Sequence, residues 1–390
     1  MLQIVQHQIN RLNEIIDGSA GGNDSFIGGQ LGLTYYYYQL YKATGDPDYR
    51  QRMEDLVVQI FANINSGCPQ LIGTSFSGGG AGLGYVMNAI SREGAIPFNI
   101  DEQFGELDNW LFNTACYQLE DDFIDFLHGA LGTVHYFTER SPAERTDFFL
   151  DELIIRLCQR VHKRDAGYWF SNYVLELEDK QNINLGLSHG QCGFLLILLN
   201  AYPRSAQKDL IEETVMEGIR FIRKYKMDVD FSNDEYSAFP FKVSENATEI
   251  SAPNRLGWCY GDLGEVLLFY RAGKLFRNDE LITLADVIGA QTLLRRSENA
   301  TMVRDSAFCH GAAGLAHFYR RLYAESREPV YLEGHEYWIE QTILLLEKEL
   351  VLNRYTGKEH GLLDGLLGVA FVLLSYVTPF DLGWSKCLLL

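Results

Sequence analysis

Two kinds of apolar stretch alternate along the chain, and they predict two kinds of helix. In the first kind, apolar residues recur at i, i+3, i+4 and i+7, the spacing of a helix with one buried face. These amphipathic stretches are 49–64, 148–164, 208–225 and 337–352. The second kind is shorter and apolar on all sides, as at 33–41, 194–200 and 369–376. A helix that is apolar on all sides is buried, so the pattern predicts inner helices paired with outer ones.

A Gly-x-x-Gly motif precedes each of the apolar stretches and occurs seven times. The first glycines of these motifs are Gly29, Gly79, Gly129, Gly190, Gly261, Gly311 and Gly365. Recurrence at a period of about 50 residues indicates a repeat architecture. Glycine at a helix start lets neighbouring segments approach closely. We therefore predict an all-α fold, an (α/α)7 toroid or barrel of seven helical hairpins closed around one axis.

The repeats extend over the chain without a linker or a shift in composition. We therefore expect a single domain over residues 1–390. Two wider intervals between repeats leave room for small excursions. The stretch near 165–180 is aromatic and β-branched, which predicts a short hairpin from residue 167 onward. The stretch 232–254 is polar and predicts a long loop of the kind that often carries function.

Composition and charge narrow the functional classes. Lys and Arg number 33 against 52 Asp and Glu, a formal charge of −19, whereas nucleic-acid binding needs a basic surface. No apolar run reaches the ~18 residues of a membrane span, and residues 1–16 predict an amphipathic helix instead of a signal peptide. We expect a cytoplasmic protein without a nucleic-acid partner. A prenylation-like match at 387–390 is too short to change that expectation.

The residues just before the first glycines carry the candidate metal chemistry. In a toroid these loops open at one end of the axis, so the fold brings them together. Cys259 and Cys309 hold the same position in successive repeats, and His310 follows directly. Two thiolates and an imidazole favour tetrahedral zinc with one open position. The alternative is two buried structural cysteines beside a core histidine.

Polar residues in the same loops are candidates for acid–base work. His189 and His128 directly precede the first glycines of repeats four and three, and they have equal geometric claims as acid or base. Asp125 lies three residues before His128, although an Asp before a helix is also a common N-cap. Arg255, four residues before Cys259, could stabilise a developing anion or pair with one of the many acids.

Three short motifs carry a resemblance to a known family. These are SHG at 188–190, WCYG at 258–261 and CHG at 309–311, on seven Gly-x-x-Gly hairpins. Together they resemble the lanthionine synthetase C-like family, the cyclases of lanthipeptide biosynthesis, over essentially the whole chain. The resemblance implies zinc ligands at Cys259, Cys309 and His310. It implies catalytic residues at Asp125, His189, Arg255 and Tyr260, the last beside the metal.

The activity implied by the resemblance is that of a stand-alone, zinc-dependent lanthipeptide cyclase. Cysteine thiolates of a dehydrated precursor peptide would add to dehydroalanine or dehydrobutyrine, giving lanthionine or methyllanthionine rings. A lanthipeptide dehydratase is a candidate partner. One departure from the expected pattern is Phe239-Pro240, where a Trp-Pro pair would be looked for upstream of WCYG.

Three alternatives remain open at the level of the sequence. The same scaffold could add glutathione or another thiol to dehydroamino acids in proteins. A zinc protein without enzymatic activity could bind peptides at the mouth of the toroid. A helical-toroid glycosidase could use paired carboxylates such as Asp125 and Asp364, but it would have no use for cysteines in register.

Overall fold

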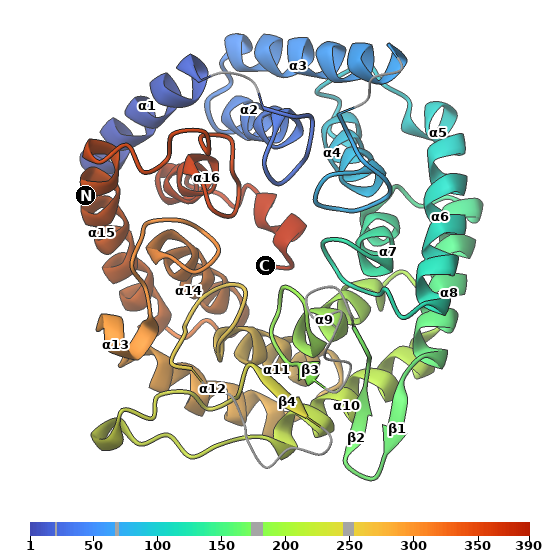
Figure 1. Cartoon of the computed structure of the whole chain (residues 1–390), viewed down its shortest axis with the longest axis vertical. Helices are drawn as coiled ribbons and strands as arrows, with labels where there is room; N and C mark the ends of the chain where they lie inside the picture. The colour runs from blue at the N-terminus through green and yellow to red at the C-terminus, as the bar shows by residue number, and fades with distance from the viewer. Residues whose placement is uncertain (20–21, 67–69, 173–181, 245–252) are drawn as a thin grey trace.

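Two concentric rings of helices make up the computed structural model, which describes residues 1–390 except 20–21, 67–69, 173–181 and 245–252 (Figure 1). The inner ring contains α2 (Gln30–Thr44), α4 (Gly80–Arg92), α7 (Ala130–Glu139), α9 (Gln191–Ala201), α11 (Leu263–Leu275), α14 (Ala312–Ser326) and α16 (Leu366–Val377). The outer ring contains α1 (Leu2–Gly18), α3 (Pro47–Asn65), α6 (Gly105–Glu120), α8 (Glu144–Gln159), α10 (Lys208–Lys224), α12 (Asp279–Leu293) and α15 (Val330–Val351). The predicted all-α toroid of seven inner and seven outer helices is confirmed.

The apolar pattern explains which helix lies in which ring. Every residue of α9 except Asn200 is buried, as expected for a helix that is apolar on all sides. The neighbouring α10 buries one face only, including Ile211, Val215 and Ile222. The outer ring closes because α1 packs against α16, so the first outer helix partners the last inner one (Figure 1).

The repeated glycines allow a close approach of backbone to backbone at the start of each inner helix. A Cβ atom at Gly79 would lie 2.3 Å from the carbonyl oxygen of Gly73. At Gly82, the second glycine of the same motif, it would lie 2.3 Å from the carbonyl oxygen of Phe76. No side chain fits at either distance, so the motif fixes how the preceding loop folds onto the helix.

Backbone hydrogen bonds join the loops before the inner helices, and we call this chain of bonds the loop circuit. The amide donors and carbonyl acceptors are Ile27 and Ser77, Ser77 and Leu127, Leu187 and Cys259, Trp258 and Cys309, Phe308 and Leu363, and Leu362 and Ile27, at 2.7–3.1 Å. The last pair joins repeat seven to repeat one. Between repeats three and four, no backbone hydrogen bond joins the described loop residues.

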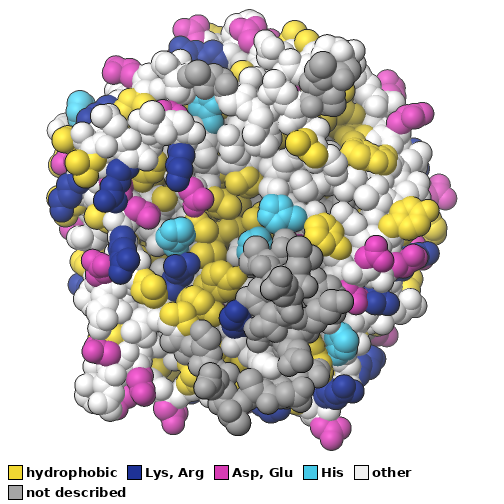
Figure 2. All heavy atoms as spheres, in the orientation of Figure 1, with side chains coloured by type: hydrophobic (Ala, Val, Ile, Leu, Met, Phe, Trp, Pro, Cys, Tyr) yellow, Lys and Arg dark blue, Asp and Glu magenta, His cyan; other side chains and the backbone are white. Residues whose placement is uncertain are grey.

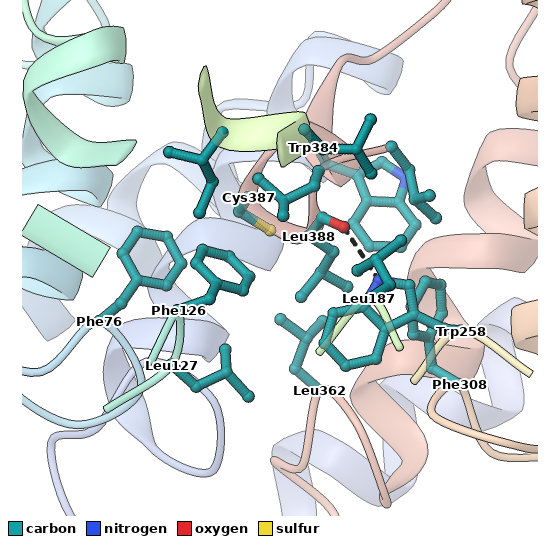
Figure 3. Close-up of a cluster of buried hydrophobic side chains, with 14 of the residues drawn as sticks. Phe76, Phe126, Leu127, Leu187, Trp258, Phe308, Leu362, Trp384, Cys387 and Leu388 are labelled. Atoms are coloured by element: carbon teal, nitrogen blue, oxygen red, sulfur yellow. Dashed lines mark hydrogen bonds between the residues drawn. The ribbon is translucent and has the colours of Figure 1, made fainter. Parts of the chain in front are cut away.

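A large apolar side chain stands three residues before each first glycine, and these side chains close the axis. The set is Phe26, Phe76, Phe126, Leu187, Trp258, Phe308 and Leu362, each at most 1% exposed. The C-terminal segment, η2 (Trp384–Leu388) and the two residues after it, is buried against them except for the exposed Lys386 (Figure 3). Trp258 Nε1 donates to the Leu388 carbonyl at 2.9 Å. We call these residues together the axial cluster.

The remaining elements are short. They are α5 (Ile100–Gln103), α13 (Glu298–Thr301), η1 (Phe231–Asn233), β1 (His162–Arg164), β2 (Gly167–Trp169), β3 (Asn182–Asn184) and β4 (Lys242–Ser244). The strand at 167–169 pairs antiparallel with β1, which precedes it, and the rest of the predicted hairpin falls largely on 173–181, outside the described residues. The predicted loop 232–254 contains β4, which pairs with β3, and its residues 245–252 also lie outside. None of the helices described combines the length and apolarity needed to cross a membrane.

Candidate functional site

Cys259, Cys309 and His310 meet where the loops of repeats five and six join. Their ligand atoms all lie within 4.8 Å of one another, so the set could hold a metal ion. The loop circuit fixes this arrangement, because the amides of Trp258 and Cys259 both donate to the Cys309 carbonyl, at 2.9 and 3.3 Å. Cys259 is buried, whereas Cys309 is half-buried and the His310 side chain is 38% exposed. The donor set is therefore reachable from one side.

The three donors are electrostatically coupled, and their chemistry fits a soft divalent cation. The hydrogen bond from Cys309 lowers the pKa of Cys259 well below the usual thiol value, and His310 adds to that effect. The same hydrogen bond raises the pKa of Cys309, and the bond that His310 donates to Cys259 raises the pKa of His310. Thiolate and neutral imidazole are the forms that bind zinc, and two sulfurs with one nitrogen match its preferences.

Asp125 replaces the missing backbone bond between repeats three and four. Its Oδ1 accepts from the amides of Leu127 and His128, both at 2.9 Å. Its Oδ2 lies 2.7 Å from His189 Nδ1 and accepts from Asn172 Nδ2 at 3.1 Å. The side chain is fully buried. Asp125 therefore holds the loop before α7 and is not its N-cap, which is Gly129. It also orients the His189 ring through Nδ1, which leaves His189 Nε2 outside that bond.

His128 lies beside His189, so both histidine candidates occupy one place. The two rings are nearly parallel, at an interplanar angle of 9°, and their centroids are 5.9 Å apart. His128 Nδ1 is 3.2 Å from the Ser77 hydroxyl, and the residue is exposed. Partial burial of the ring lowers the pKa of His128. The negative charge of Asp125 raises this pKa, and the adjacent His189 lowers it further.

Tyr260 is held by residues of the short sheet next to the inner ring. Its hydroxyl accepts a hydrogen bond from Asn184 Nδ2 at 2.6 Å. Its ring stacks on Phe241, with centroids 4.8 Å apart. A Cβ at Gly186 would lie 2.6 Å from the Tyr260 ring, so this glycine makes room for the tyrosine. Tyr260, next to Cys259, is therefore part of a toroid loop and is held in place by residues of the short β3–β4 sheet and its flank.

Arg255 lies close enough to the donor set for its charge to lower the pKa of Cys259, after the larger effects of Cys309 and His310. Its guanidinium makes none of the hydrogen bonds or ion pairs found among the described residues, so the expected alternative of a salt bridge has no support there. A buried pair that sequence reasoning missed supports the adjoining backbone. Arg295, paired with Asp262 at 2.8 Å, donates to the Asn254 carbonyl at 2.8 Å.

Hydrophobic side chains gather at the centre of the face shown in Figure 2, with histidine side chains along their edge. A cavity of about 280 Å³ opens beside the donor set, and its lining includes Asp305, His310, Lys358 and Asp364. Asp364 thus lines the same cavity as His310, whereas both carboxylate oxygens of Asp125 already take part in hydrogen bonds. This arrangement does not favour the paired carboxylates of a glycosidase.

The fold and this site together define an α/α toroid with a Cys–Cys–His donor set at one mouth. The family model of the lanthionine synthetase C-like protein matches residues 22–389, and the chain belongs to this family. A solved structure named nisin cyclase has the same fold, with a TM-score of 0.78 at 17% sequence identity over 99% of this chain and 96% of that chain. No curated protein matches the sequence.

Proposed function

We propose that this protein is a zinc-dependent lanthipeptide cyclase, which closes thioether rings in a dehydrated precursor peptide. The observation that carries the proposal is the convergence of two groups at one mouth of the toroid. One is the donor set of Cys259, Cys309 and His310, and the other is His189 oriented by buried Asp125. Membership of the lanthionine synthetase C-like family supports the same chemistry. A cytoplasmic location and a dehydratase partner stay predictions.

The donor set supplies three ligands and is open on one side, so a tetrahedral ion held there would have one position left for the substrate. Zinc bound there would act as a Lewis acid that keeps the sulfur of a substrate cysteine in its thiolate form. Cys259 and Cys309 supply the two sulfur ligands and His310 the nitrogen. The apolar centre of the mouth offers a surface for the side chains of a peptide (Figure 2).

Different residues of the chain then assist different steps of the addition. The sulfur forms a bond to the β-carbon of the dehydro residue, and the electron pair of the C=C bond moves toward the α-carbon and its carbonyl. Arg255 stabilises the charge that develops there. His189, held by Asp125 through Nδ1, donates a proton from Nε2 to the α-carbon. Tyr260 lies next to Cys259 and lines the path to the donor set.

The test is a thiol count on a dehydrated precursor peptide incubated with the zinc-loaded protein. Ring closure leaves the mass of the peptide unchanged and removes one alkylatable thiol per ring. Cys309→Ala, which lacks one donor, should leave the count unchanged. With an authentic precursor, an unaltered count for the wild type would overturn the proposal. A mass gain equal to glutathione, when glutathione is present, would assign the scaffold to thiol addition instead, and peptide binding without reaction would indicate a binding scaffold.

A further inference from the structure

Two imidazoles lie side by side between repeats three and four, and only one of them bonds the Asp125 carboxylate through its ring. Asp125 bonds the backbone amide of His128 through Oδ1 and the ring of His189 through Oδ2. The two rings lie parallel with centroids 5.9 Å apart. Only one of the two is explained by the proposed function, because a single proton donor suffices for the α-carbon.

The two rings have different hydrogen-bond partners: His189 bonds a carboxylate, and His128 bonds a hydroxyl. His189 turns Nδ1 to the Asp125 carboxylate at 2.7 Å. His128 turns Nδ1 to the neutral hydroxyl of Ser77 at 3.2 Å. When Nδ1–H donates to that hydroxyl, Nε2 carries the lone pair. Among the described residues, the titratable groups that act on His128 are Asp125 and His189. Burial of the ring and the neighbouring His189 lower the pKa of His128, which favours the neutral ring that a base needs.

We propose that His128 is a second catalytic residue of the thiol addition, the base that takes the proton of the substrate thiol while His189 serves as the acid. This inference rests on the proposed function. The acid–base pair then consists of one imidazole bonded to a buried carboxylate and a parallel imidazole bonded to a serine hydroxyl.

The step balances without a further reactant. The thiol S–H bond breaks, and its proton goes to His128 Nε2. The S–C bond forms, the C=C electron pair moves to the α-carbon, and the proton of His189 completes the thioether. Sulfur and α-carbon are separated by one carbon atom in the product, so two rings spaced 5.9 Å apart can serve both. His128 is exposed and returns its proton to solvent, from which His189 is reprotonated.

The deciding experiment is the pH profile of cyclisation by the zinc-loaded protein with a dehydrated precursor peptide. We expect the wild-type rate to fall on the acidic side as His128 becomes protonated. His128→Asn should lose about 10²-fold in kcat with little change in KM, and that acidic fall should disappear. Ser77→Ala keeps the imidazole but frees its orientation, and a severalfold loss with a displaced acidic fall is expected. His7→Asn, an exposed histidine on α1, is the matched control.

Chemical rescue separates a catalytic role from a structural one. Free imidazole should restore part of the activity of His128→Ala because the site is exposed, and it should do nothing for His7→Ala. An unchanged acidic fall in His128→Asn, or an equal loss at every pH without rescue, would overturn the inference. Cyclisation by the wild type in the same assay shows that such a result leaves the proposed function standing, whereas a wild type that forms no rings contradicts the proposed function itself.

Discussion

The donor set and the acid–base pair occupy equivalent loops, yet different forces hold them. In repeats five and six, the carbonyls of Cys259 and Cys309 accept backbone bonds from neighbouring loops. At the joint between repeats three and four, side chains do this work: Asp125 bonds the ring of His189, and Asn172 donates to both Asp125 and the His189 carbonyl. Backbone hydrogen bonds remain when a side chain is substituted, whereas the hydrogen bonds of the Asp125 carboxylate are lost with that side chain. A change in the donor set should therefore remove chemistry and keep the fold, while a change at the joint should affect both.

The largest effect is expected for Cys309→Ala. The variant should lose nearly all bound zinc and all measurable cyclisation, because a tetrahedral site with two protein ligands binds metal weakly. Its circular dichroism and metal-free unfolding should match those of the metal-free wild type, since the Cys309 carbonyl still accepts its backbone bonds. Cys116→Ala, a half-buried cysteine on α6, is the control. Full zinc occupancy in Cys309→Ala would exclude this ligand set.

Two substitutions of Asp125 test the other side of the comparison. Asp125→Asn keeps an oxygen for the two amides but loses the acceptor for His189, so kcat should fall by about 10²-fold or more while zinc stays bound. Asp125→Ala leaves buried donors without partners, which should lower the free energy of unfolding by about 2–5 kcal/mol. Urea unfolding measures the difference between them. Equal stability of the alanine variant and the wild type would show that the joint does not depend on this carboxylate.

Local pattern predicted the helices and the donor set for a physical reason. Apolar periodicity reports how much of each helix is buried, and the glycine motif marks the start of each inner helix, so the ring followed from spacing alone. The cysteines could be paired because Cys259 and Cys309 hold one register position. The axial cluster could have been found in the same way. Aligning the repeats one position further back gives Phe76, Trp258 and their counterparts, all large and apolar.

Other parts of the site depend on contacts that no local pattern contains. Asn172 reaches Asp125 from an excursion outside the repeat, and nothing in its own neighbourhood marks it. The pair of Asp262 and Arg295 joins the two ends of one helical hairpin, α11 and α12, and looks like ordinary surface charge in the sequence. Both contacts arise because polar residues are brought together away from solvent, and this burial depends on tertiary structure and not on local sequence. The lack of a backbone hydrogen bond between the described loops of repeats three and four likewise depends on how the whole ring closes.

Below the acid–base pair, His135 on α7 provides a pH test of the axial cluster. It is fully buried, with its ring stacked on Tyr85 and in contact with Phe76 and Phe126. Burial lowers the pKa of His135 from 6.5 to about 3. The unfolded chain therefore binds this proton below pH 6.5 and the folded protein does not, so stability falls as pH drops from 6.5 toward 3. The expected loss from this residue is about 2 kcal/mol at pH 5.

The comparison that isolates this effect is His135→Phe against His7→Phe, the latter at an exposed position on α1. Unfolding free energies measured from pH 7 to pH 4 should decline less steeply in His135→Phe than in the wild type. His7→Phe should keep the wild-type slope. If all three proteins lose stability in parallel, the buried histidine is not the group that titrates.

The smallest effect concerns how the donor set is anchored to the axial cluster. Trp258 precedes Cys259, and its indole donates to the Leu388 carbonyl (Figure 3). Trp384 is buried to the same degree and donates to the Ser375 hydroxyl at 2.7 Å, on α16, which carries none of the three donors. Trp258→Phe and Trp384→Phe each remove one buried hydrogen bond, so each should lower stability by about 1 kcal/mol. Only Trp258→Phe should weaken zinc binding, severalfold in a chelator competition, because it frees the loop that carries a ligand. An equal loss of zinc affinity in both variants would mean that the whole axial cluster, and not the Trp258 contact, holds the metal side in place.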